Sequence, residues 1–167
     1  PRKNLKLLGG NPLIYHTIKE ARLVDCIKEI VVSSEDDEIN TYANTQEISI
    51  DYIRPQALSK DDTPMADVIL DIIEWMESQG KKHNDFILLQ PTSPLRTSKN
   101  INDAIDEYNR LNSKSLASVH LMREHPYECV KGKGTEWEDL VEKDKVFHRR
   151  QDFDNGYYYI NGAIYIC

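Results

Sequence analysis

The sequence is poor in the residues that build metal sites and membrane spans. Its three cysteines lie far apart, at Cys26, Cys129 and Cys167, and its five histidines include no i, i+3 or i, i+4 pair. Structural zinc sites need such close pairs. No apolar run approaches the ~20 residues of a membrane-spanning helix, and we recognise no signal peptide. These absences predict no metal ligands of this kind, no membrane association, and reduced thiols in a cytoplasmic protein.

Basic residues are too few for a nucleic-acid-binding protein. The chain has 21 Lys and Arg against 28 Asp and Glu, a net charge of −7. Proteins that bind nucleic acids carry a basic face, so we expect no nucleic-acid partner. A small anion is not excluded, because a few arginines can line one pocket of an acidic protein. The arginines stand in short clusters, at Arg2-Lys3, Arg54, Arg96 and Arg149-Arg150.

Length and composition indicate one globular domain. The chain has 167 residues, of which 40% are hydrophobic and 29% charged, enough to bury one continuous core. We therefore predict a single domain over residues 1–167. The chain starts at Pro1, and Cys167 directly follows a strand-like run. We expect an excerpt of a longer chain, incomplete at both ends.

Helical spacing alternates with short β-branched runs along the first two thirds of the chain. The pattern predicts helices over residues 13–21, 35–44, 64–76 and 101–111. It predicts strands over residues 30–32, 48–53, 86–89 and 116–121. For the third helix, Thr63 is the expected N-cap and Pro64 the first helical residue. This alternation favours a Rossmann-like α/β fold, with a mostly parallel sheet and helices on both faces.

The last third of the chain is less regular. Residues 123–152 are polar and weakly periodic, and we expect them to form a long excursion from the domain. Two short strand runs follow, over residues 157–160 and 163–166. Asn161-Gly162 lies between them and predicts a turn.

Polar residues follow the predicted strands, where ligands bind in open α/β sheets. Gln90 ends one strand, and the prolines after it prevent the strand from continuing. Its amide suits a base, a sugar hydroxyl or a neighbouring backbone group equally well. Arg149 and Arg150 precede the last strands, and a guanidinium can bond two oxygens of a carboxylate or phosphate at once. A surface ion-pair cluster with Asp152 is the alternative.

Seven motifs then occur in one order. They are PRKNLK at residues 1–6, VSSEDDEI at 32–39, Arg54-Pro55, DDTP at 61–64, LLQPTSPLR at 88–96, RRQD at 149–152 and NGAIYI at 161–166. In this order and spacing they resemble the acylneuraminate cytidylyltransferases, also called CMP-sialic acid synthetases, from end to end.

The resemblance implies a nucleotidyltransferase with a Rossmann-like fold. The implied reaction joins a sialic or sialic-like nine-carbon sugar acid to CMP, using CTP and Mg²⁺ and releasing pyrophosphate. The implied assembly is a homodimer in which the 123–152 excursion contributes to dimerisation and caps the substrate. Catalysis of such a displacement is mostly positioning and charge stabilisation.

The resemblance also assigns roles to individual residues. Nucleotide binding falls to Lys3, Asn4, Arg54, Thr63 and Gln90. Sugar binding falls to Gln90, Arg150, Asn161 and Tyr165. The catalytic cations are Lys3, Arg149 and Arg150, with the two arginines near the sugar carboxylate.

Two segments of the family pattern are not in this sequence. We expect a glycine-rich phosphate loop before Pro1 and an Asp-x-Asp metal pair after Cys167, so no metal ligand is predicted within the chain. One alternative is a cytidylyltransferase for another sugar acid, such as 3-deoxy-manno-octulosonate. Another is a non-catalytic dimerising module of the same fold. The RRQD and NGA motifs favour the nine-carbon substrate.

Overall fold

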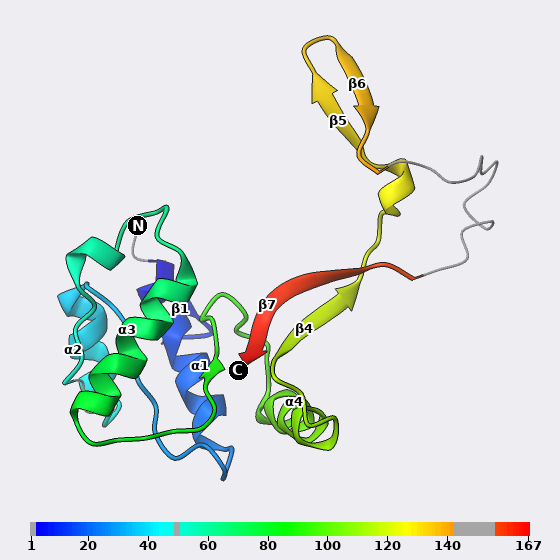
Figure 1. Ribbon diagram of the computed structural model, residues 1–167. Helices are drawn as coiled ribbons and strands as arrows, with labels where there is room; N and C mark the ends of the chain where they lie inside the picture. The colour runs from blue at the N-terminus through cyan, green and yellow to red at the C-terminus, as the bar shows by residue number, and fades with distance from the viewer. Residues whose placement is uncertain (1–2, 49–50, 142–155) are drawn as a thin grey trace. The chain divides into compact units, whose positions relative to one another are not determined.

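The computed structural model describes residues 3–48, 51–141 and 156–167 (Figure 1). The chain falls into two units. Unit 1 comprises Pro1–Leu116 and Ala163–Cys167, and unit 2 comprises Ala117–Gly162. None of the helices in the described residues is long and apolar enough to cross a membrane.

Unit 1 contains the four helices that the sequence predicts. They are α1 (Leu13–Arg22), α2 (Asp37–Thr45), α3 (Met65–Ser78) and α4 (Ser98–Arg110), with short 3-10 turns η1 (Lys3–Leu5) and η2 (Gln56–Leu58). Local caps explain two of the starts. The Asp36 carboxylate accepts from the Glu38 N–H at 2.9 Å, and Thr97 and Asn100 form a reciprocal capping box.

The expected cap of α3 is wrong. Pro64, not Thr63, is the N-cap residue, and no side chain caps this helix. The backbone of Pro64 is extended, with ψ at 134°, so the helix begins one residue later, at Met65. Proline satisfies the helix start without a cap bond because its fixed φ suits either position and it has no N–H to satisfy.

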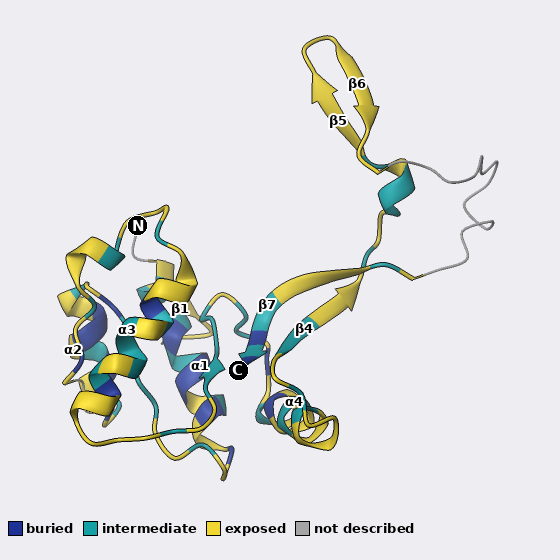
Figure 2. Cartoon of the chain, viewed as in Figure 1, coloured by how far each residue is buried: buried dark blue, intermediate teal, exposed yellow. Residues whose placement is uncertain are grey.

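Two apolar clusters form the core of unit 1 (Figure 2). The first joins α1 and α2 to the segments beside them and comprises Ile14, Ile18, Val32, Ile39, Ala43 and Ile48. The second joins α4 to the end of the chain and comprises Val24, Ile101, Ile164 and Ile166. Helical spacing on α1, α2 and α4 therefore marked faces that are buried.

The prediction of a mostly parallel sheet is not confirmed. Residues 30–34 and 51–54 have no regular secondary structure and form no ladder; one backbone bond joins them, from the Arg54 N–H to the Ser34 carbonyl at 3.1 Å. Val32 and Tyr52 in these segments are buried, at 8% and 3% exposure. The apolar runs thus predicted burial correctly. They did not predict a ladder, because a ladder also requires a partner strand in register.

The described strand pairs are antiparallel. β1 (Leu7–Leu8) pairs with β2 (Asn11–Pro12) across Gly9 and Gly10, both at positive φ. β3 (Ile87–Leu88) pairs with β7 (Tyr158–Ile166), with Ile87 opposite Ile166 and Leu88 opposite Tyr165. The strand order of this sheet is β3-β7-β4, where β4 is Leu116–Leu121.

The predicted turn at Asn161-Gly162 is wrong, because β7 runs through both residues as one strand. Gly162 has a φ of 73°, which glycine adopts readily and which disturbs the regular extended geometry at that point. An Asn-Gly pair is a turn signal only where the flanking runs pair with each other. Here the runs pair with β3 and β4 instead.

Unit 2 contains a hairpin within the predicted excursion. After η3 (Pro126–Glu128), β5 (Val130–Lys133) pairs with β6 (Glu136–Asp139), and all eight hairpin residues are exposed. Residues 142–152 of the excursion lie outside the described residues. None of the described residues of unit 2 is buried.

Candidate functional site

The structure places most of the predicted site residues in unit 1. These are Lys3, Asn4, Arg54, Thr63, Gln90 and Tyr165. Asn161 belongs to unit 2, where it is exposed and its side-chain oxygen accepts from the Ser118 hydroxyl at 2.6 Å. Arg149 and Arg150 lie outside the described residues.

Arg54 is held against the segment that precedes α2. Its Nε donates to the Ser33 hydroxyl at 3.0 Å, and its Nη2 donates to the Ser33 carbonyl at 2.7 Å. Ser34, next in the chain, is 6% exposed, and its carbonyl accepts from the Asn40 amide at 3.3 Å. This arrangement fixes a half-buried cation beside the start of α2. A fixed guanidinium with unused N–H donors suits a phosphate oxygen or a base carbonyl.

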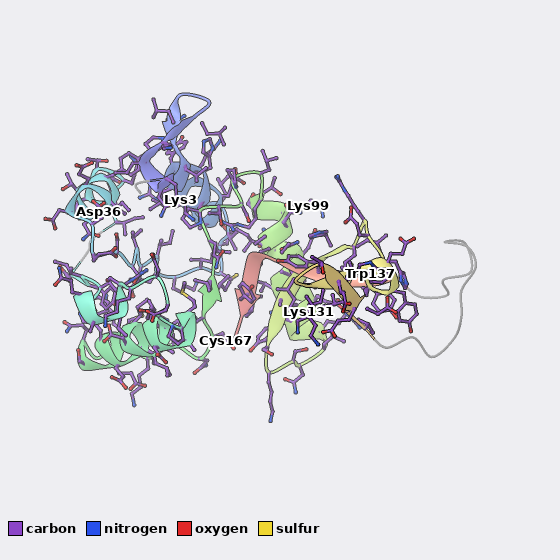
Figure 3. All side chains as sticks on the ribbon, turned by 90° about the horizontal axis from the view of Figure 1, so that it is seen from above. Lys3, Asp36, Lys99, Lys131, Trp137 and Cys167 are labelled. Atoms are coloured by element: carbon purple, nitrogen blue, oxygen red, sulfur yellow. The ribbon has the colours of Figure 1, made fainter. Side chains whose placement is uncertain are left out.

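Lys3 and Asn4 lie on the turn η1, which packs against α1. Leu5 of η1 contacts the core cluster that includes Ile39 and Ala43 of α2. Figure 3 labels Lys3 on η1 and Asp36 at the start of α2. Lys3 is exposed, whereas the side-chain oxygen of Asn4 is buried and has no hydrogen-bond partner within residues 3–48, 51–141 and 156–167. Among the described residues, η1 therefore offers an exposed lysine and a buried acceptor without a partner.

Thr63 is half-buried at the end of the loop between Arg54 and α3. Its N–H donates to the Lys60 carbonyl at 3.1 Å. Within the described parts of the chain, no hydrogen bond joins Thr63 to the Arg54–Ser33 pair. The structure thus joins Arg54 to Ser33 by hydrogen bonds, whereas Thr63 is bonded to neither residue among those described.

Gln90 and Tyr165 come from paired strands. Leu88 lies opposite Tyr165, and Gln90 follows two residues after Leu88. The Gln90 carbonyl accepts from the Ser93 N–H at 3.3 Å and from Arg96 at 3.2 Å. Its side-chain amide makes no hydrogen bond with the residues that the structure describes. The backbone of Gln90 therefore ties the proline loop, and the side chain remains available to a ligand.

Sequence reasoning missed a pocket between α3 and residues 51–55. Its volume is about 480 Å³, and it is lined by Asp51, Tyr52, Ile53, Pro55, Asp71, Glu74 and Trp75. The Tyr52 hydroxyl donates to Asp71 at 2.6 Å, and the Tyr52 and Trp75 rings lie 5.4 Å apart. Burial and then this hydrogen bond raise the pKa of Tyr52 to about 12. Three carboxylates on its wall make the pocket unsuited to a triphosphate.

Sequence reasoning also missed the structural role of Arg96, which is buried. The sequence grouped Arg96 with candidate anion-binding arginines, but it is 6% exposed and bonds three protein oxygens. The signal for this role was the loop before it, whose two prolines cannot donate backbone hydrogen bonds. No group of three or more His, Cys, Asp or Glu that could hold a metal ion occurs among the residues described.

Comparison with known proteins places these features in a family. The chain matches the family described as Cytidylyltransferase over residues 1–166. It is 31% identical to CMP-N,N'-diacetyllegionaminic acid synthase of Legionella pneumophila subsp. pneumophila, covering 100% of this chain and 71% of that protein. It is 34% identical to N-acylneuraminate cytidylyltransferase of Streptococcus agalactiae serotype III, covering 99% of this chain and 39% of that protein.

A solved structure shares the fold at low sequence identity. CMP:2-keto-3-deoxy-manno-octonic acid synthetase complexed with CTP aligns with a TM-score of 0.63 and 14% identity, covering 98% of this chain and 66% of that one. This likeness supports an α/β nucleotidyltransferase-like fold.

Proposed function

Because the chain belongs to the cytidylyltransferase family, we propose that it transfers the cytidylyl group of CTP to a sialic or sialic-like nine-carbon sugar acid. The observation that carries the proposal is the match along the whole chain to relatives named for legionaminic acid and N-acylneuraminate. In this reaction the anomeric hydroxyl attacks the α-phosphorus and loses its proton. The bond from that phosphorus to the pyrophosphate oxygen breaks, so the products are the CMP-sugar and pyrophosphate.

We assign the nucleotide side to the cations around α2. Arg54 donates two hydrogen bonds to Ser33, through Nε and Nη2. These bonds orient the guanidinium and leave its further N–H donors for the nucleotide. Lys3 is exposed on η1, and Leu5 of this turn packs against the core cluster of α1 and α2. We assign to Lys3 a mobile positive charge for the triphosphate. Asn4, Thr63 and Gln90 complete the proposed nucleotide contacts. Fixed and mobile cations together offset the charge that develops on the phosphates during displacement.

We assign the sugar side to the β3–β7 edge. The Gln90 amide makes no hydrogen bond with the described residues, and Tyr165 lies on the paired strand. Arg150, with Arg149 beside it, remains our proposal for the clamp on the sugar carboxylate, and Asn161 remains a proposed sugar contact. Arg149 and Arg150 are proposed from the family resemblance alone.

Mg²⁺ is the proposed cofactor. The described residues offer no ready-made cluster of metal ligands. Magnesium in nucleotide sites is commonly held by one or two carboxylates together with substrate phosphates and water, so it needs no such cluster. Bound to CTP, it would neutralise phosphate charge, and no residue of this chain is assigned to it.

We also propose a homodimer in which unit 2 meets a second copy of the chain. Unit 2 has no buried residue in its described part, so it has no core of its own there. Its exposed apolar residues are Val119, Leu121, Val130, Trp137, Leu140, Val141, Tyr158, Tyr159 and Ile160. Exposed apolar residues in this number support the proposal of a protein-protein contact in this unit.

The cytoplasm is the proposed location. Cys26, Cys129 and Cys167 are free thiols, which a reducing compartment preserves.

The second candidate is a cytidylyltransferase for an eight-carbon acid such as 3-deoxy-manno-octulosonate. The CTP-bound octonic acid synthetase with a TM-score of 0.63 favours it. A single panel separates the two. The complete protein is incubated with CTP, Mg²⁺ and each sugar acid, and pyrophosphate and the CMP-sugar are measured.

We expect product with nine-carbon acids, loss of activity with EDTA, and recovery with excess Mg²⁺. Product with the eight-carbon acid alone would establish the second candidate. Absence of product with every acid would refute both.

A further inference from the structure

Arg96 is a buried cation that joins three parts of unit 1. The residue is 6% exposed. Its Nη1 donates to the Gln90 carbonyl at 3.2 Å and to the Ala163 carbonyl at 2.6 Å. Its Nη2 donates to the Thr17 hydroxyl at 2.9 Å. One guanidinium therefore connects the end of β3, the middle of β7 and the helix α1.

Holding a charge here is costly. Burial lowers the pKa of Arg96, and the nearby Glu20 carboxylate offsets only part of that effect. The Glu20 carboxylate also accepts from the Ser98 N–H at 2.7 Å. The Nε of Arg96 has no hydrogen-bond partner in the described parts of the chain. A well-packed apolar side chain can fill such a space at lower cost, so packing alone does not account for a guanidinium.

The guanidinium sits where the β3–β7 ladder ends. Leu88 lies opposite Tyr165, and the antiparallel register continued by two residues sets Gln90 opposite Ala163. β3 ends at Leu88, so Gln90 and Ala163 lie just beyond the paired residues of this ladder. Nη1 of Arg96 bonds both carbonyls of this next pair. The side chain thus holds the two segments together just beyond the end of β3.

We propose that Arg96 is a positioning residue that holds Gln90 ready for the sugar substrate by fastening its main chain to β7. The proposal rests on the proposed function, in which Gln90 contacts the sugar. The Gln90 amide makes no hydrogen bond with the described residues, so the direction of this side chain depends on its main chain. Tyr165, the other proposed sugar contact in unit 1, lies two residues beyond Ala163 on the same strand.

A lysine at position 96 would keep the charge and lose the bridge. An ammonium on a flexible stem cannot fix two carbonyls and a hydroxyl in one plane as a guanidinium does. Gln90 would then be displaced by a fraction of an ångström to an ångström. Errors of this size in a positioning group cost up to about a hundredfold in rate.

The test is a double-mutant cycle in the complete protein with Arg96→Lys, Gln90→Ala and the pair of changes together. We expect Arg96→Lys to lower kcat/KM for the sugar acid by about 10- to 100-fold when Gln90 is present. In the Gln90→Ala background the same change should cost less than about threefold, because the residue it acts through is gone. Equal losses in both backgrounds, or no loss, would overturn the proposal.

Arg110→Lys is the matched control, because Arg110 is exposed and bonds only Glu107 among the described residues. If Arg96→Lys does not fold, Thr17→Val replaces it in the cycle, since it removes the anchor of Nη2 and leaves the guanidinium in place. Coupling of Thr17→Val to Gln90→Ala would support the clamp, and additivity would overturn it.

Hydrogen exchange provides a readout without activity. The Ser93 N–H donates to the Gln90 carbonyl, and its exchange should accelerate in the Arg96 variant but not in the Arg110 variant. If the wild-type protein activates no sugar acid, the proposed function fails while this measurement still tests the clamp. Unchanged exchange at Ser93 would contradict the clamp itself.

Discussion

The Arg54 guanidinium donates two hydrogen bonds to Ser33, one to its hydroxyl at 3.0 Å and one to its carbonyl at 2.7 Å. The two residues come from segments that form no strand ladder, so this side chain joins two segments that a sheet does not hold together. It also holds a cation in one orientation next to α2. Orientation and charge are both needed for binding a nucleotide, which is why Arg54 is the first residue to change.

Arg54→Lys should raise the KM for CTP by about 10- to 100-fold, equivalent to the ~1.5–3 kcal/mol of a hydrogen bond to a charged group. Lysine keeps the charge but cannot bond Ser33 twice and still face a ligand. Steady-state kinetics with varied CTP measure the effect, and Arg110→Lys is the exposed control. A KM equal to that of the wild type would remove Arg54 from the nucleotide site.

Gln90→Ala should lower turnover by about 100-fold and leave the fold intact. The tie of the proline loop runs through the Gln90 carbonyl, which the substitution retains, so packing is preserved. Circular dichroism tests whether the fold is intact, and steady-state kinetics with varied sugar acid measure turnover. Gln79→Ala, on the exposed end of α3, is the control. Unchanged turnover with an unchanged spectrum would show that the Gln90 amide has no role in the reaction.

Tyr52→Phe should lower the free energy of unfolding by about 1.5–3 kcal/mol at neutral pH, because it leaves the Asp71 carboxylate without its 2.6 Å donor. The difference should shrink above pH 10. The pKa of Tyr52 is raised to about 12 in the folded protein, from 10.0. As pH rises from 10 to 12, the unfolded tyrosine ionises first, so the wild type loses stability that the Phe variant does not lose.

Urea unfolding at pH 7 and at several pH values above 10 measures this dependence. Tyr158→Phe is the control, since Tyr158 is 64% exposed. A gap between wild type and Tyr52→Phe that stays constant up to pH 12 would contradict the assignment of the raised pKa to Tyr52.

Trp137→Ser should weaken self-association. Trp137 lies on β6 with 67% of its surface exposed, and burying an aromatic ring of this size is a common source of interface energy (Figure 3). Light scattering across micromolar concentrations should report dimer for the wild type and more monomer for the variant. Lys131→Ala on the paired strand is the control. A wild-type protein that is monomeric throughout would refute the dimer.

The sequence by itself determined the helices of this protein. Asp36 and the Thr97–Asn100 pair are caps within three residues of the groups they bond, and the buried faces of α1 and α4 repeat at helical spacing. Such signals are local, so they can be read without knowing the fold. The motif around Gln90 and the family of the chain could be predicted from the sequence because they too depend on short stretches of residues.

Only the tertiary structure decided which strands pair and what the arginines bond. β-branched residues at 30–32 indicated burial, but partners and register depend on segments far away in the sequence. Arg96 reaches acceptors 67 and 79 residues distant, at Ala163 and Thr17. Its burial turned a candidate ligand-binding residue into a structural clamp. Asn161-Gly162 likewise became part of one strand, because its neighbours pair with β3 and β4 and not with each other.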